Sequence, residues 1–223
     1  MKSEILVPES LNEISLERYQ RFVKLIEDNE ESEFVKQKTI SILCGVDMEQ
    51  VRKMAFNSID EIYIYLIKLF EPKQQLLSRF TFKDDNREFG FIPSLDEMTT
   101  GELADLDDYY NDVQSWHKMM AVLYRPVTKK LGNLYDIEPY KESLMYSDLM
   151  KSVPVSTVLG AQVFFSDLGK ELLIVTMDYL EQMPEQDKQS IIEKHNSEKS
   201  GVGIIRFMRS PKETLSRLIK QPE

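Results

Sequence analysis

A run of acidic side chains lies between residues 96 and 108, and carboxylates so close together could bind a metal ion or serve as a general acid and base. The run lacks the alternating oxygen ligands and the central glycine of a calcium-binding loop. On a helix, Asp105 and Asp108 share a face while Asp107 points elsewhere. Acid–base catalysis would need a cleft and raised pKa values, of which the sequence gives no sign. We therefore interpret the run as a solvated or partner-facing acidic surface made of Asp96, Glu97, Glu102, Asp105, Asp107 and Asp108.

Other residues capable of chemistry are few. The chain has two histidines and one cysteine, too few for a multi-histidine or multi-cysteine metal centre or for a disulfide within this chain. Cys44 and His117 lie in apolar surroundings and are predicted in the core or an interface, whereas His195 lies in a polar run. No serine has the flanking glycines of a nucleophile elbow, and Gly201 and Gly203 fall short of a phosphate-binding loop. The sequence predicts no catalytic residue, no cofactor and no metal.

Arg125 lies between an aromatic residue and a proline, which restrict its conformation more than the neighbours of the other basic residues do. An arginine held in this way can form a fixed ion pair. We expect it to end a helix with a structural salt bridge, to Asp105 or Asp107.

The composition limits the classes of partner. The 223 residues are 42% hydrophobic and 30% charged, which is typical of a folded protein, and the formal net charge is −10. That charge argues against general binding of nucleic acid, which needs many lysines and arginines. It fits either a protein partner with basic patches or simple solubility.

The longest apolar region, residues 153–177, is interrupted by Asp167, Lys170 and Glu171 and is predicted as a core helix, not a membrane span. The N-terminal apolar run is too short for a signal peptide, so we expect no export.

Helical periodicity dominates the chain, and we predict a mainly α (α+β) fold with one small β-hairpin around residues 79–92. Ser10 or Asn12 is expected to cap a first helix that reaches Asp28, Gly45 to end a second helix, and Asp47 to cap a third segment. Further helices are predicted over residues 59–70, 100–113, 116–124, 140–150, 154–177 and 178–195. We expect a helical domain over residues 1–177 and a C-terminal helical arm over residues 178–223.

The hairpin is the least ordinary element. Residues 79–83 and 87–91 alternate apolar and polar positions around a polar turn, which places four phenylalanines on one surface: Phe80, Phe82, Phe89 and Phe91. A two-stranded hairpin alone is marginally stable, so it must pack on helices, join another strand or bind a partner. An acidic helix entry at Thr99 or Thr100 follows, then a helix that Arg125 and Pro126 end, then a connector containing Gly132 and Asn133.

Several segments of this chain carry a family resemblance. They are Ile92-Pro93-Ser94-Leu95-Asp96, the run from Thr100 to Asp107, His117–Pro126, Tyr135–Tyr140 and Leu159–Gly169, together with the opening Leu11–Gln20. In combination they resemble a group of small structural or assembly proteins of tailed bacteriophages, including crAss-like phages. The likeness covers roughly residues 8–175 and does not extend to the region after Met177.

The resemblance implies a non-enzymatic structural protein of the phage particle, assembled in the host cytoplasm and present in several copies at the portal vertex, capsid or tail. Its expected partners are other phage structural proteins, with no direct contact to nucleic acid or membrane. The alternative is a tail or baseplate assembly chaperone that is absent from the mature particle. In either case we expect partner binding through the hairpin phenylalanines, the acidic residues 96, 97, 105, 107 and 108, and Arg125.

Overall fold

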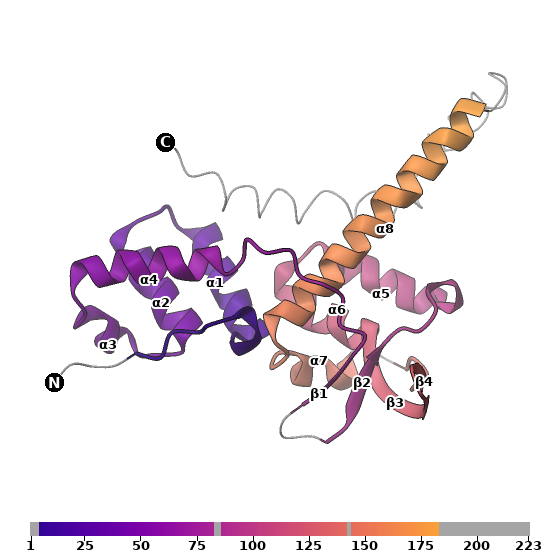
Figure 1. Ribbon diagram of the computed structural model, residues 1–223, viewed down its shortest axis with the longest axis horizontal. Helices are drawn as coiled ribbons and strands as arrows, with labels where there is room; N and C mark the ends of the chain where they lie inside the picture. The colour runs from indigo at the N-terminus through magenta and orange to yellow at the C-terminus, as the bar shows by residue number, and fades with distance from the viewer. Residues whose placement is uncertain (1–4, 83–85, 142–143, 183–223) are drawn as a thin grey trace. The chain divides into compact units, whose positions relative to one another are not determined.

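The computed structural model describes residues 5–82, 86–141 and 144–182, and it divides the chain into two compact units, residues 1–161 and 162–223. The described part is mainly α-helical with a small four-stranded antiparallel sheet, which confirms the predicted fold class (Figure 1). The part of the expected C-terminal arm from residue 183 onward lies outside the described residues.

Short helices fill the N-terminal part of the first unit. They are the 3₁₀ helix η1 (Leu11–Glu13), α1 (Leu16–Asp28), α2 (Glu33–Cys44), α3 (Met48–Arg52) and α4 (Phe56–Lys68). Gly45 has φ +68° and ends α2, as predicted. The predicted start of the first helix was wrong, because α1 begins only after Ser15, whose side chain accepts a hydrogen bond from the amide of Arg18. The preceding backbone is extended there, because Ile14 and Leu16 bond to Val155 and Val153.

An aromatic cluster joins these helices to a later one. On α1 the Tyr19 ring stacks on Trp116 at 5.8 Å, and the Phe22 ring stacks on Phe70 at 5.9 Å between centroids. Tyr19, Phe22 and Trp116 are buried. Stacked aromatic pairs of this kind add to the hydrophobic burial that fixes the helices together.

The sheet contains two strands that the sequence did not predict. Its strands are β1 (Arg79–Thr81), β2 (Glu88–Phe91), β3 (Tyr124–Leu131) and β4 (Leu134–Ile137), in the order β1-β2-β3-β4. The predicted hairpin is therefore half of a larger sheet, and the expected connector around Gly132 is a second hairpin. The preceding helix ends at Leu123 because the chain enters β3 there, with Arg125 and Pro126 inside the strand.

Strand register separates the hairpin side chains onto two faces, as the alternation predicted. Phe80 lies opposite Phe89, Phe91 opposite Tyr124, and Gly90 opposite both Arg79 and Arg125. Because directly opposed residues share a face, one face is aromatic and the other carries the two arginines. The aromatic face contacts α7 (Leu144–Met150), where the Tyr146 ring meets Phe89 at 5.4 Å.

The remaining helices follow the hairpins. They are η2 (Leu95–Glu97), α5 (Thr100–Tyr110), η3 (Val113–Ser115), α6 (Trp116–Leu123), α7 and α8 (Val155–Gln182). Among the residues described, no helix is long and apolar enough to cross a lipid bilayer.

A polar cluster links α1 to η3 and α6. The Gln20 amide nitrogen lies 2.8 Å from the Val113 carbonyl oxygen, 3.0 Å from that of Gln114 and 3.2 Å from His117 Nδ1. This nitrogen carries two hydrogens for three neighbouring acceptor positions, and the role of His117 Nδ1 depends on the tautomer of the ring. Burial lowers the pKa of His117 below its usual 6.5; Lys151 and Lys118 lower it further, against smaller raising effects of Asp148 and the Gln114 backbone.

We expect acid to destabilise the protein through His117. The folded chain binds this proton less readily than the unfolded chain, so stability is complete above pH 6.5 and falls as the pH drops from 6.5 toward the lowered folded-state pKa. Urea unfolding between pH 7.5 and 5.5 measures the slope, and His117→Asn, whose amide oxygen can accept from Gln20, should flatten it. An unchanged slope in that variant would contradict the assignment.

Candidate protein-binding surface

Two of the four hairpin phenylalanines are too deeply buried to contact a partner. Phe89 and Phe91 are buried in the core, whereas Phe80 and Phe82 are half-buried. The Phe82 ring lies edge-on to Phe80 and Phe89 at 5.2 Å from each. Phe89 and Phe91 therefore fix the sheet to the core, and only Phe80 and Phe82 keep surface that a partner could contact.

The acidic residues divide in the same way. Glu97 and Asp108 are exposed, while Asp105 and Asp107 are half-buried. Asp105 accepts a hydrogen bond from the Tyr140 hydroxyl, and one carboxylate oxygen of Asp107 is buried with no hydrogen-bond partner within the described ranges. The side chain of Asp96 lies outside the described residues. No group of three or more potential metal-binding side chains gathers within the described ranges.

Arg125 forms its ion pair with Glu102, not with Asp105 or Asp107 as expected. The guanidinium Nη2 lies 2.7 Å from Glu102 Oε1, and the two residues are only 7% and 3% exposed. The Tyr140 ring covers the guanidinium at 5.6 Å, and the other two guanidinium nitrogens are buried with no hydrogen-bond partner among the described residues. This pair holds β3 against the first turn of α5.

The first turn of α5 explains why Glu102 is available. Thr99 caps the helix by accepting from the Glu102 amide, and Glu102 Oε2 accepts from the Thr99 amide at 2.7 Å and from its hydroxyl at 2.8 Å. This capping box turns the carboxylate back toward the helix start, so that its other oxygen can meet Arg125. Asp105 instead accepts a hydrogen bond from the Tyr140 hydroxyl.

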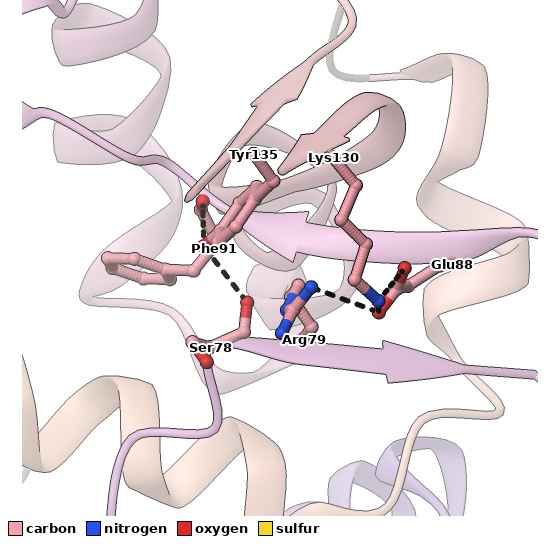
Figure 2. Close-up of polar contacts among 6 residues, drawn as sticks. All are labelled: Ser78, Arg79, Glu88, Phe91, Lys130 and Tyr135. Atoms are coloured by element: carbon pink, nitrogen blue, oxygen red, sulfur yellow. Dashed lines mark hydrogen bonds and ion pairs between the residues drawn. The ribbon is translucent and has the colours of Figure 1, made fainter. Parts of the chain in front are cut away.

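Tyr135 from β4 covers the face of the sheet that lies opposite the phenylalanines. Its hydroxyl lies 2.8 Å from the Phe91 carbonyl oxygen and 3.1 Å from that of Ser78. Figure 2 draws both contacts as dashed lines. A Cβ atom on Gly90 would lie 2.5 Å from the Tyr135 ring, so glycine lets the ring lie directly on β2. The ring thereby reaches across β3 to β2. Burial raises the pKa of Tyr135, opposed by Arg79.

Charged side chains complete that face. Glu88 accepts from Lys130 Nζ at 3.0 Å and lies 3.6 Å from Arg79 Nη1, and the two cations converge on it in Figure 2. The Arg79 guanidinium lies 5.3 Å from the centre of the Tyr135 ring. Such partly exposed pairs each contribute little stability, but together they fix the β3–β4 hairpin on the first one.

We expect Tyr135→Phe to lower the free energy of unfolding by about 1 kcal/mol, because the ring still covers Gly90 while the Phe91 carbonyl loses its donor. Urea unfolding measures the change. Tyr65→Phe on α4 is the matched control, since Tyr65 is 42% exposed and its change should be near zero. Equal effects of the two variants would contradict a specific role for the Tyr135 hydroxyl.

The described sheet leaves two features free for partners. Its edge strands are β1 and β4, and an edge strand presents backbone groups with which another chain can pair. The end of the β3–β4 hairpin also exposes two leucines, Leu131 at 80% and Leu134 at 75%. Neither leucine was singled out from the sequence, although Gly132-Asn133 between two leucines is a recognisable two-residue hairpin turn.

The chain matches no protein-family model, no curated protein and no solved structure.

Proposed function

We propose that this chain is a non-enzymatic structural protein of a tailed phage particle, located at the portal vertex, capsid or tail, which binds other particle proteins. The family resemblance of its motifs motivates this role. The observation that carries the binding mechanism is the edge strand β1, in which Phe80 is only half-buried and after which Phe82 is half-buried as well. An extended segment of a partner would pair with β1 and cover the two rings.

The acidic net charge of the chain suits a partner segment with basic residues. Glu97 and Asp108 are exposed, and the whole chain carries a net charge of −10. A partner segment with alternating apolar and basic residues would place its apolar side chains on Phe80 and Phe82. Its main chain would supply the affinity and its side chains the specificity.

Mass spectrometry of purified particles of the encoding phage tests the role. Recovery of the chain at a constant ratio to the other particle proteins is expected, with cross-links from residues near β1 to one neighbour. Phe82→Asp should reduce incorporation, whereas Phe56→Asp on α4, at a position that is 63% exposed, should not. Absence from particles, with complexes found only in infected cells, would overturn the proposal in favour of an assembly chaperone.

A further inference from the structure

The end of the β3–β4 hairpin carries a small exposed surface with a defined pattern, here called the tip face. Leu131 lies opposite Leu134 across a two-residue turn, and Lys129 lies opposite Asp136. Because residues two apart on a strand share a face, all four side chains point the same way, and all four are exposed. Gly132 begins the turn with φ +61°, the conformation that tight two-residue hairpin turns need at this position.

The other face of the same hairpin holds it in place. Lys130 bonds to Glu88, and Tyr135 lies against Gly90. Lys130 and Tyr135 alternate along the strands with the tip-face residues, so they attach the hairpin to β2 from the other face. Because these contacts hold the hairpin against β2, the tip face is not part of a free loop. Less conformational entropy is therefore lost when the tip face binds.

Its charges are balanced but unpaired. Lys129 and Asp136 form no ion pair with any residue in the described part of the chain, although they are cross-strand neighbours. The tip face thus has two leucines, Leu131 and Leu134, next to the turn. Farther from the turn on the same face it has one positive charge, Lys129, and one negative charge, Asp136. An anionic membrane would repel Asp136, and a uniformly charged protein surface would repel one of the two charges.

We propose that the tip face is the contact between two copies of this chain, related by a two-fold axis parallel to the strands of the hairpin. This axis places Leu131 of one copy on Leu134 of the second copy, and Lys129 of one copy against Asp136 of the second copy. The symmetry repeats both contacts, so each leucine is covered and each charge is paired. A surface that satisfies itself in this way is the property of a two-fold interface.

The dimer is weak in isolation. A face of this size is well below the roughly 800 Å² per partner of a stable interface, so the contact needs high concentration or a shared assembly to form. The inference does not depend on the phage-particle role, because two-fold pairing requires only the chain itself.

Analytical ultracentrifugation of the purified chain up to about 1 mM, the concentration range of the weakest measurable associations, tests the proposal. Wild-type protein should form a concentration-dependent dimer. Lys129→Glu should weaken it at least about tenfold, because the introduced carboxylate would face Asp136 twice, and Asp136→Lys should do the same by bringing lysines together. Both positions are exposed, so thermal unfolding should change little.

Mixing the two variants provides the decisive result. Neither should dimerise alone, but a one-to-one mixture should, because each altered charge then meets its opposite across the axis. In a Cys44→Ser background, Leu131→Cys mixed with Leu134→Cys should form a disulfide-linked pair containing one of each.

A wild-type chain that stays monomeric at about 1 mM would overturn the proposal. Dimers unaffected by the charge changes, or a mixture that remains monomeric, would overturn it as well.

Discussion

Glu102→Gln is expected to lower the free energy of unfolding by about 3 kcal/mol, toward the lower end of the cost of breaking a buried ion pair. The glutamine can still close the capping box, so the start of α5 remains capped. What is lost is the negative charge beside Arg125, whose guanidinium is nearly buried and has two further nitrogens with no hydrogen-bond partner in the described part of the chain. The remaining positive charge would be uncompensated inside the fold.

Two further variants separate the charge from the cap. Thr99→Ala removes the cap and leaves the ion pair, and should cost only about 1 kcal/mol. Adding Arg125→Met to Glu102→Gln removes the stranded charge and should recover part of the lost stability, since apolar replacements of whole buried pairs are often tolerated. Urea unfolding of the four proteins at pH 7 measures these differences. A Glu102→Gln variant within about 1 kcal/mol of wild type, or a double variant less stable than the single one, would contradict this account.

Local patterns predicted the elements they encode. Gly45 ended a helix, Thr99 with Glu102 began one, and the alternation of phenylalanines placed them on one face of a hairpin, all as expected. These features depend on residues close together in sequence, where backbone geometry and capping decide the outcome. The tertiary context added little to them.

Features that depend on distant residues were missed. Tyr124 through Leu131 was not recognised as a strand, because the arginine and proline after Tyr124 suggested the end of a helix. The strand forms because β2 offers an edge on one side and β4 on the other. The partner of Arg125 was misassigned for a related reason, since only the fold shows that Glu102 turns inward while Asp105 meets Tyr140.

The burial of Phe89 and Phe91 is the correction with the largest consequence for function. An exposed aromatic hairpin and a buried one have the same alternation, because the pattern shows which residues share a face but not what covers it. Here Tyr146 from α7 packs on Phe89, and Tyr124 packs beside Phe91 on the same face of the sheet. The accessible apolar surface consequently moves to Phe80 and Phe82 at the edge strand and to the tip face of the second hairpin.

Gly160→Ala is expected to destabilise the protein by about 1 to 3 kcal/mol, the usual cost of overpacking, although alanine is the better helix former. Gly160 lies on α8, where an added Cβ atom would be 2.1 Å from the Gln75 carbonyl oxygen and 2.8 Å from its carbonyl carbon. The obstacle is backbone, which cannot rotate away as a side chain would. Residues just after Gln75 are also anchored, because the Tyr124 hydroxyl donates to the Leu77 carbonyl at 2.7 Å.

The same substitution at Gly101 is the matched control. Gly101 lies in the first turn of α5, and its added Cβ atom would meet nothing closer than the Thr99 hydroxyl at 3.9 Å. Gly101→Ala should therefore stabilise the protein, by up to about 1 kcal/mol, because alanine restricts the unfolded chain. Thermal and urea unfolding of both variants should give effects of opposite sign. If both variants are stabilised, the close approach of α8 to Gln75 is wrong. If Tyr124→Phe reduces the cost of Gly160→Ala, the anchored carbonyl at Leu77 is what keeps the backbone from yielding.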